Sequence, residues 1–522
     1  MLTALGTTSL AFLTGTSKAS NFKNEYAKAA SAFDHEDLHS LSVYNIKDFG
    51  AIGDGETLST IAIQKAIDAC SSNGGGIVWV PNGVFLSATI ILKSNVALYL
   101  GATAVLMGVA DIQVYKHTAF IYAEEQDNIA IFGRGTVYGQ GENAAFHGED
   151  NFNGIKGRPH AIHLWKCSNI QLKEFTLKNS ASWSIELQES INITVDDIKV
   201  EGRCVANNDG LDIVDCHYIR VSNSYFDCGD DGICPKSMSK MGVKNLVITN
   251  CIVKSESNAI KFGTAGVGGF QDITISNCTI YDTRLSGIAL ELVDGGIMDR
   301  ITITNITMHK VNGGIFIKLG RRKTKIPGIL RNIIISNVIA DGIGSWKPDK
   351  TASYYKDAYD PRIGMTITGL PGYEVENINI FHVYMQFEGG GTKKDAKSIM
   401  VDKPAVYPEY NNYGITPAYA FNCRYVKNLR FSDVQFDLIK EDHRPALFFD
   451  HSSIIRLTAV DMKINNKASS FIRLNEVTDI FVTGCKPQNA DIPFILLDEK
   501  SRDITEVSND FSRVKKGIEH QS

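Results

Sequence analysis

Short segments that alternate apolar and polar residues recur along most of the chain. Each copy holds two brief apolar runs separated by a polar or small corner. Six successive copies start at Asn169, Asn192, Tyr218, Asn245, Asp272 and Arg300. Their starts are 23, 26, 27, 27 and 28 residues apart. Alternation at period two predicts half-buried β-strands, so every copy supplies at least two short strands.

The repeat continues towards the C-terminus, where further copies begin at Asn332, Asn377, Asn428, Ile454 and Asp479. A period of 20 to 30 residues is typical of a solenoid. The leucine-dominated consensus of leucine-rich repeats is missing, and a propeller blade needs about 40 residues. We therefore predict an all-β fold, a right-handed parallel β-helix, since parallel crossovers are overwhelmingly right-handed. A β-sandwich is the weaker alternative, because its hairpins rarely keep one motif over so many copies.

The regions outside the regular repeat suggest a domain organisation. Residues 40–110 are expected to form the N-terminal cap and the first strands, with a capping helix in the segment STIAIQKAIDAC that begins at Ser59. Residues 111–515 are expected to form the main β-helix domain. Two insertions, 341–376 and 388–427, are rich in Tyr, Pro and Gly, which is common in functional loops but also in inert surface loops.

Composition excludes several classes of protein. Of 522 residues 43% are apolar, which excludes a disordered chain, and no apolar run is long enough for a transmembrane helix. The 53 basic and 58 acidic residues are nearly balanced, so we expect neither nucleic acid nor a membrane as partner. Ten cysteines show no zinc-type spacing, so no metal site is expected from them.

Two acidic segments within the repeats are the best candidates for chemistry. They are NNDGLD, from Asn207, and GDDG, from Gly229. Asp209 and Asp230 are 21 residues apart, close to one repeat, so a β-helix would stack them on neighbouring turns. Two adjacent carboxylates repel each other, so their pKa values differ and one of them keeps its proton to a higher pH. Glycosidic hydrolysis needs one protonated and one ionised carboxyl group. The same segments also fit ordinary turns or a calcium site.

At these residues the sequence resembles glycoside hydrolase family 28, the polygalacturonase and rhamnogalacturonase family of right-handed parallel β-helices. The order of several motifs carries the resemblance: TVYGQG, GRPHAIHLWKCSNI, NSASWSIELQESINITV and YPEYNNYGITPAYAFNCRYVKNL. The resemblance implies inverting hydrolysis of α-glycosidic bonds without metal or other cofactor. Asp230 would be the general acid, while Asp209 and Asp231 would hold and deprotonate the attacking water.

Two family motifs differ in this chain. Asn258 stands where polygalacturonases carry the histidine of Gly-His-Gly, and the segment from Ala289 to Glu291 replaces their Arg-Ile-Lys. Cations that could bind a uronate carboxylate lie nearby, or belong to solvated turns. The candidates for substrate binding are Asn258, Lys261, Lys318, Arg321 and Arg322. The expected partner is an acidic polysaccharide or oligosaccharide that is pectic, rhamnogalacturonan-like or otherwise contains uronate.

Two alternative functions and a cellular location complete the sequence-based expectations. A polysaccharide lyase could use the same fold with Ca²⁺ at the acidic cluster, and a non-catalytic carbohydrate-binding β-helix would explain the altered motifs. Tyr- and Trp-bearing insertions, including Trp346, Tyr354, Tyr355 and Tyr359, would stack on sugars or block one end of a cleft. Residues 1–20 are apolar and small and end near Ser17-Lys18-Ala19, like an export signal without its basic start. We therefore expect a secreted or periplasmic protein.

Overall fold

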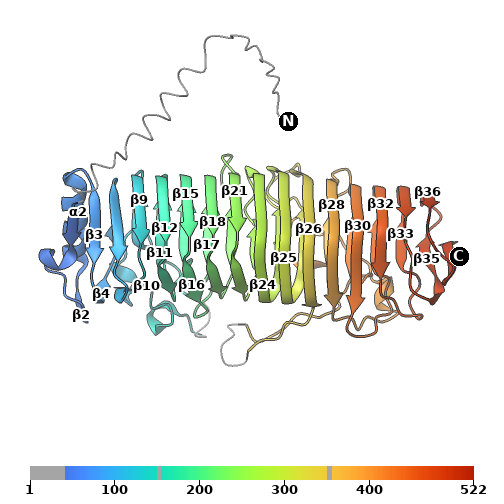
Figure 1. Cartoon of the computed structure of the whole chain (residues 1–522), viewed down its shortest axis with the longest axis horizontal. Coiled ribbons are helices and arrows are strands. Elements are labelled where there is room, and N and C mark those ends of the chain that lie inside the picture. Colours follow the sequence, from blue (N-terminus) through green and yellow to red (C-terminus); the bar gives the residue numbers. More distant parts are fainter. Residues whose placement is uncertain (1–41, 150–153, 350–354, 522) are drawn as a thin grey trace, which may run out of the picture. The chain divides into compact units, whose positions relative to one another are not determined.

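The computed structural model of the protein describes residues 42–149, 154–349 and 355–521. The chain divides after Val43, and residues 44–522 form one compact unit. The predicted export segment, residues 1–20, lies outside the described residues. In the compact unit the strands lie side by side along one axis (Figure 1), and every pairing between its strands is parallel.

The strands form three parallel stacks, each running along the axis. Stack 1 comprises β2 (Asp54–Leu58), β4 (Gly83–Ser87), β7 (Ala104–Gly108), β10 (Thr136–Tyr138), β13 (Thr176–Lys178), β16 (Lys199–Gly202), β19 (Tyr225–Cys228) and β22 (Ile252–Ser255). Stack 2 comprises β3 (Gly76–Val80), β6 (Val96–Leu100), β9 (Asp127–Phe132), β12 (Ser168–Lys173), β15 (Ile191–Asp196), β18 (His217–Ser222), β21 (Val243–Thr249), β26 (Ile329–Ile343), β28 (Val375–Phe387), β30 (Val426–Leu438), β32 (Ser453–Met462), β34 (Thr478–Thr483) and β36 (Arg502–Val507).

Stack 3 carries the acidic residues singled out above. It comprises β5 (Ile90–Ile91), β8 (Ala119–Glu124), β11 (His160–Trp165), β14 (Ile185–Gln188), β17 (Leu211–Val214), β20 (Ile233–Lys236), β23 (Ile260–Phe262), β27 (Met365–Thr368), β29 (Phe421–Arg424), β31 (Leu447–Asp450), β33 (Ile472–Asn475), β35 (Ala490–Leu497) and β37 (Val514–His520). Two long strands bend through all three stacks: β24 (Gly269–Leu292) and β25 (Ile297–Leu319). The C-terminal parts of β26, β28, β30 and β32 continue stack 1. The fold class predicted from the sequence, a parallel β-helix, is confirmed, and the antiparallel sandwich is excluded.

The start of each sequence repeat coincides with a corner of the β-helix. Asn169 and Asn192 have φ of 54° and 56°, and Asn245, Asn332 and Asn377 share this left-handed conformation. Asparagine tolerates it well because its short polar side chain bonds locally. These side chains also form a ladder between coils, in which Asn192 Nδ2 donates to Asn169 Oδ1 at 3.2 Å. The excess of asparagine in the repeat is thus explained by the corners.

The residue after each of these corners points into the core. Ile170, Ile193, Ile219, Leu246 and Ile273 lie in register on consecutive coils. All five are at most 2% exposed. Burying such a side chain stabilises a fold by about 1.5–3 kcal/mol, so this repeated column is a main source of stability.

The N-terminal end of the solenoid is covered by helix α2 (Thr60–Ser72), which follows β1 (Val43–Asn45) and the 3-10 helix η3 (Ile46–Phe49). One face of α2 is buried, with Ala62, Ile63, Ala66, Ile67 and Cys70 packed inward. Without this helix the first coil would expose its apolar interior to water. The predicted capping helix is therefore present (Figure 1).

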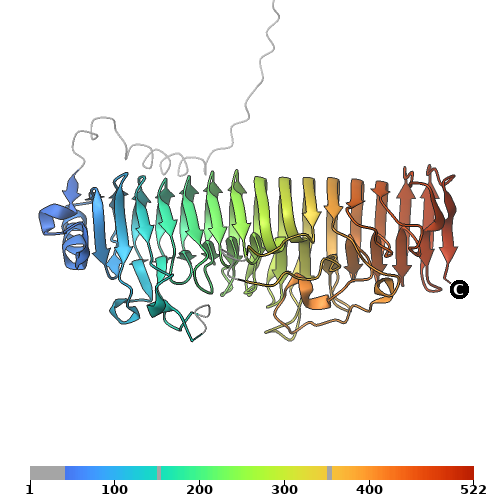
Figure 2. The same cartoon turned by 90° about the horizontal axis from the view of Figure 1, so that it is seen from below.

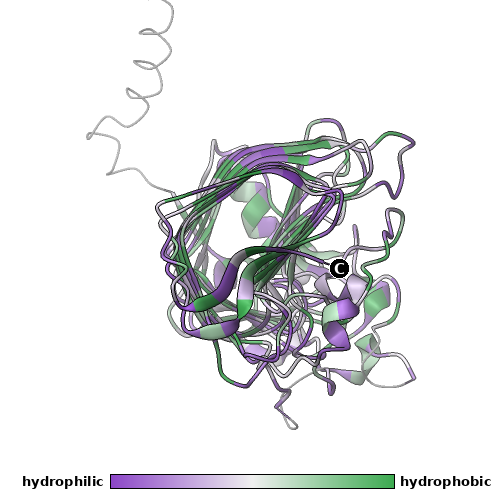
Figure 3. Ribbon diagram, turned by 90° about the vertical axis from the view of Figure 1, so that its right-hand side faces the viewer, coloured by the Kyte–Doolittle hydropathy of each residue, from purple (hydrophilic) through white to green (hydrophobic). Residues whose placement is uncertain are grey.

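Two long loops, 344–364 and 388–420, leave the regular coils on the same side (Figure 2). The expected insertion 341–376 contains β27, which pairs with β25 and β29, so the irregular part is shorter than that range. Two short 3-10 helices lie in the loop 388–420: η6 (Asp395–Lys397) and η7 (Tyr410–Tyr413). Two others lie in earlier loops: η4 (Ile112–Val114) and η5 (Ala144–Phe146). Figure 3 looks along the axis and shows loops gathered on one side of the superimposed coils.

Cysteines contribute to the core rather than to crosslinks. All ten are free thiols, and nine of them are buried. Cys251 and Cys278 stand on successive coils, and each is 1% exposed. Among the described residues no helix is long and apolar enough to span a membrane.

Candidate active site

Three aspartates meet where two neighbouring coils enter stack 3. Asp209 precedes β17, and Asp230 and Asp231 precede β20. Backbone hydrogen bonds fix this alignment, because Gly210 N donates to Asp231 O at 2.9 Å and Asp230 N donates to Asn208 O at 3.2 Å. One carboxylate oxygen from each aspartate lies within 4.8 Å of the others. The predicted stacking on neighbouring turns is therefore present.

Buried polar side chains hold the segment before Asp209. The Asn208 side chain is fully buried, accepts from the backbone of Cys204 and Val205, and donates to Ser180 O at 2.7 Å. Arg158 donates to Ala206 O at 2.6 Å in the same segment. A loop tied to its neighbours in this way keeps the aspartate in one position, which preorganised catalysis requires.

Asp231 is surrounded by donors. Lys261 Nζ lies 3.2 Å from its Oδ2. The backbone N and the side-chain Nδ2 of Asn258 donate to its Oδ1 at 3.1 and 3.0 Å. Burial acts to raise the pKa of Asp231, but Lys261, Lys236 and the Asn258 bonds outweigh it and lower that pKa below its ordinary value. Asp231 is thus held as a carboxylate.

Asp209 has a different environment. Lys236 Nζ lies 3.1 Å from its Oδ2 and also contacts Asp212. Burial nevertheless raises the pKa of Asp209, and the neighbouring Asp231 charge adds to the increase. The ammonium group of Lys236 also lies 4.4 Å from the centre of the Trp183 ring, a cation–π contact.

Asp230 has surroundings that favour its protonated form. It forms no ion pair with any residue that the structure describes, and its Oδ1 accepts from the backbone N of Asp231 at 2.9 Å. Burial, followed by the charges of Asp209 and Asp231, raises its pKa well above the ordinary value. The surroundings thus favour the protonated form of Asp230 and the ionised form of Asp231, while the pKa of Asp209 is also raised.

Comparison with known proteins identifies the family of the chain. Residues 70–369, which include all three aspartates, match the family described as glycosyl hydrolases family 28. The chain belongs to this family. It is a polygalacturonase-like member: over 306 residues it is 30% identical to a probable polygalacturonase from Vitis vinifera, an alignment covering 52% of this chain and 61% of that protein.

Two further likenesses to this family 28 chain come from bacterial proteins. An exo-poly-alpha-D-galacturonosidase from Dickeya chrysanthemi is 26% identical over 321 residues, covering 49% of this chain and 53% of that protein. The crystal structure of a hyperthermoactive exopolygalacturonase from Thermotoga maritima superposes with a TM-score of 0.58 at 22% identity, covering 66% of this chain and 87% of that one. This structural likeness supports the fold alone.

A segment of the loop 388–420 covers the next part of the family 28 site. Lys261 Nζ lies 3.3 Å from Glu409 Oε1 and 3.2 Å from the Tyr407 hydroxyl. Glu409 Oε2 also accepts from Asn258 Nδ2 at 3.4 Å. Sequence reasoning did not assign Glu409 or Tyr407 to the site, although both stand at the start of the family motif YPEYNNYG.

The other cations predicted to bind substrate are Lys318, Arg321 and Arg322, and none of them contacts the three aspartates. Lys318 is 1% exposed, and its Nζ donates to Asn412 Oδ1 at 2.9 Å. Its pKa falls to about 8, chiefly through burial. Arg322 forms an ion pair with Asp294 at 2.5 Å, while Arg321 Nη1 donates to the Lys325 carbonyl on an exposed turn. The structure thus brings Asn258 and Lys261 to the aspartates and leaves Arg321 away from them.

Residues of the preceding coils lie next to the aspartate group. His160 Nδ1 lies 2.9 Å from Glu186 Oε2, and the His160 ring lies 5.1 Å from that of Trp183. Glu186 is in register with Asp212 on the next coil. These residues fall in GRPHAIHLWKCSNI and NSASWSIELQES, and counting one repeat back from Asp212 would have located Glu186 from the sequence.

Aromatic residues of the loop 344–364 have other contacts. Trp346 is only 2% exposed, so its ring packs inside the protein. The rings of Tyr355 and Tyr359 lie 3.8 and 4.8 Å from the Arg284 guanidinium. Tyr354 lies outside the described residues.

The three aspartates could also be considered as ligands of a metal ion. However, Lys236 and Lys261 already contact Asp209 and Asp231. Two ammonium groups at these distances occupy carboxylate oxygens that Ca²⁺ would need, and they repel a divalent cation. The donor set therefore fits acid–base chemistry better than metal binding.

Proposed function

We propose that this chain hydrolyses α-glycosidic bonds in an acidic, pectic polysaccharide by a single displacement that inverts the anomeric centre. One observation carries the proposal. A protonated Asp230 stands directly beside Asp231, which Lys261 keeps ionised, on a rigid pair of coils. This division of protonation states is what hydrolysis of a glycoside requires at neutral pH.

In this reaction Asp230 donates its proton to the oxygen of the scissile bond as the bond to the anomeric carbon breaks. A water molecule held by Asp231 and Asp209 attacks that carbon from the opposite face. Its proton passes to the ionised carboxylate, so one water is consumed and one new reducing end forms. Lys236 donates a hydrogen bond to Asp209, and Asn258 donates one to Asp231. These two bonds keep the carboxylates in place during the attack.

The relatives from Vitis vinifera and Dickeya chrysanthemi are named as a probable polygalacturonase and an exo-poly-alpha-D-galacturonosidase. These names support a uronate-containing substrate for this chain. The two lysines on the carboxylates argue for hydrolysis over a calcium-dependent lyase. A lyase would leave an unsaturated product that absorbs ultraviolet light, whereas hydrolysis would leave a saturated reducing end.

The proposal is tested with the Asp230→Asn variant and a panel of pectic oligosaccharides. We expect loss of turnover by a factor of about 10³ or more, because the general acid is gone, with binding retained. Asp491→Asn, an exposed position on β35, is the matched control and should keep the wild-type rate. Proton NMR of early products should show the inverted anomer; a wild-type rate in Asp230→Asn, or an unsaturated product, would overturn the mechanism.

We further propose that the protein acts outside the cytoplasm, where pectic polymers are encountered. The apolar segment of residues 1–20 supports this location. Expression of the full chain with a C-terminal tag, followed by cell fractionation and N-terminal sequencing, tests it. Recovery of the uncleaved chain from the cytoplasm alone would contradict it.

A further inference from the structure

Two of the four cations expected to bind substrate carboxylates already form ion pairs within the protein. Lys261 contacts Asp231 and Glu409, and Arg322 contacts Asp294. A polyanionic substrate nevertheless needs positive charge somewhere along its path. The described surface offers such charge in a separate pocket nearer the C-terminus.

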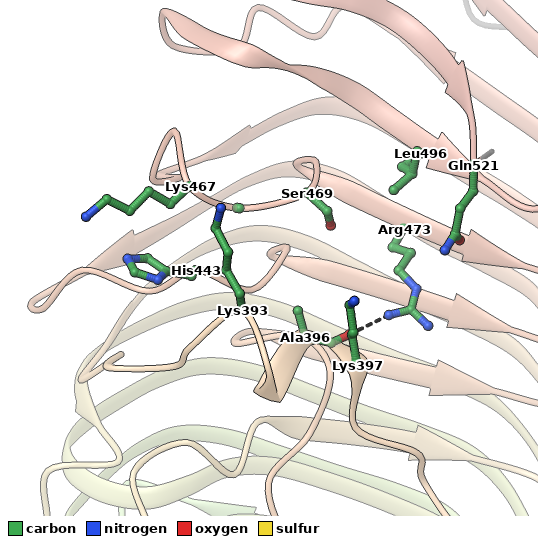
Figure 4. Close-up of a pocket in the computed structure, with 10 residues that line it drawn as sticks. Lys393, Ala396, Lys397, His443, Lys467, Ser469, Arg473, Leu496 and Gln521 are labelled. Carbon is green, nitrogen blue, oxygen red and sulfur yellow. Dashed lines mark hydrogen bonds between the residues drawn. The ribbon is translucent and has the colours of Figure 1, made fainter.

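This basic pocket encloses about 230 Å³ on the side of the loop 388–420. Its charged and titratable lining residues are Lys393, Lys397, His443, Lys467 and Arg473 (Figure 4). Small and apolar groups such as Ala396 and Leu496 form the rest of its wall. None of its lining residues that the structure describes carries a carboxylate side chain.

The cations of the basic pocket are available for a ligand. None of the five forms an ion pair with an acidic residue in the described part of the chain. Arg473 is half-buried, donates Nη1 to the Ala396 carbonyl, and has its guanidinium 4.7 Å from the Phe448 ring. Burial lowers the pKa of Arg473, and the charges of Asp450 and Asp498 oppose that effect only in part.

The basic pocket lies on the same face of the solenoid as the aspartates. Lys261 is followed in strand register by Ala289, Phe316, Thr366, Asn422, Phe448 and Arg473. Arg473 is thus six strands from Lys261, or about 29 Å at the usual spacing between strands. The five residues between them are at most 5% exposed, so a polysaccharide that contacts both places would pass over the loop that covers these strands.

The loop 388–420 connects the two places physically. Lys393 and Lys397 stand near its start, and η6 places them at the basic pocket. Glu409 stands near its end and contacts Lys261 beside the aspartates. The face between the pocket and the active site is therefore spanned by a single segment of chain.

We propose that the basic pocket is a secondary binding site for the carboxylates of the uronate-containing polysaccharide, separate from the active site. This inference rests on the proposed function for the identity of the ligand. The guanidinium of Arg473 can hold one carboxylate through two parallel hydrogen bonds, while the lysines act as mobile point charges. A chain that occupies both sites gains avidity without any new contact at the aspartates.

The test measures binding in the Asp230→Asn background by titration calorimetry, so that no substrate is consumed. The probe is an oligogalacturonate of about ten residues, long enough to reach both sites. Adding Lys393→Ala and Lys397→Ala, or Arg473→Gln, should weaken binding at least tenfold, and Arg473→Lys should restore part of the loss. The matched control removes the exposed lysines Lys65 and Lys240, which lie elsewhere on the solenoid.

Several results would overturn the inference. One is unchanged affinity in the pocket variants; another is an equal loss in the Lys65→Ala/Lys240→Ala control, which would indicate a general charge effect. Tight competition by inorganic phosphate would show a site for small anions instead. If the wild type cleaves no uronate glycan while the pocket variants still lose binding, the proposed function is wrong. The proposal that the basic pocket binds uronate carboxylates then still holds.

Discussion

Lys261 Nζ lies 3.2 Å from Asp231 Oδ2, although the two residues come from successive coils of the β-helix. Both side chains are almost fully buried, at 1% and 4% exposure. In such surroundings the ammonium group favours the ionised aspartate strongly, and Asp231 favours the charged lysine in turn. The pair links the protonation state of the site to the stability of the fold.

Replacing Lys261 with Met should therefore move the pH profile. Without the ammonium group the pKa of Asp231 rises, and Asp231 is ionised only at higher pH. The acidic limb of kcat/KM against pH should shift upward, with a lower maximum rate. Loss of one partner from a buried pair also costs about 3–5 kcal/mol of stability.

Lys240→Met provides the control for this experiment, because Lys240 is exposed. Its profile should match the wild type. If Lys261→Met folds and keeps the wild-type acidic limb, Asp231 does not take part in the rate-limiting ionisation.

Trp183, whose ring contacts Lys236 beside Asp209, should provide a platform for a sugar ring. Its ring is half-buried between Lys236 and His160. Trp183→Ala should raise KM about tenfold or more, because an apolar contact of about 1.4 kcal/mol or more is lost. kcat should fall less, and Trp183→Phe should recover part of the affinity.

Trp79 on β3, which is 37% exposed, serves as the comparison tryptophan. Trp79→Ala should leave KM unchanged. Equal effects of the two substitutions on KM would remove Trp183 from the substrate path.

Glu291 should limit stability at neutral pH. It is fully buried, its Oε1 has no hydrogen-bond partner, and burial raises its pKa well above the ordinary value. A carboxyl group with a raised folded pKa binds more protons in the folded state, so its contribution to stability is lost as pH rises above its unfolded pKa. Glu291→Gln should then raise the unfolding free energy by about 1 kcal/mol at pH 7 and change little near pH 4.

Thermal unfolding followed across pH 4–8 tests this prediction, with the exposed Glu374→Gln as control. A melting temperature that falls in Glu291→Gln at pH 7 would show that Glu291 is ionised and stabilising in the folded state.

Ile454 occupies a corner where most copies of the repeat have a polar residue. Its φ is 58°, a conformation that a β-branched side chain adopts only with strain. Ile454→Asn should stabilise the protein by about 1 kcal/mol, because the strain is relieved and the new amide can join the ladder at Asn428. Denaturant unfolding measures this, and Asn377→Ile at the equivalent corner should destabilise; the reverse order would contradict the corner rule.

Much of the fold could be predicted from the sequence because a β-helix is a local repeat. The polar residue at each corner and the Ile or Leu that follows it are neighbours in sequence, and each coil pairs only with adjacent coils. The separation of 21 residues between Asp209 and Asp230 matches one coil, which is why their proximity could also be predicted.

Long-range contacts could not be predicted in the same way. Glu409 lies 148 residues after Lys261 in the chain, and nothing in the period of the repeat indicates that a loop returns to cover that lysine. For the same reason Lys261 could be recognised as a cation, but its ion pair with Glu409 could not be predicted.

By itself, then, the sequence determined the parallel solenoid, its capping helix and the candidate group of three aspartates, since these depend on short-range periodicity. Only the tertiary structure decided which aspartate keeps a proton, which lysines remain free and where the basic pocket forms. Those properties depend on burial and on charges brought together from distant segments, and electrostatic interactions in a low-dielectric interior follow distance in space rather than separation along the chain.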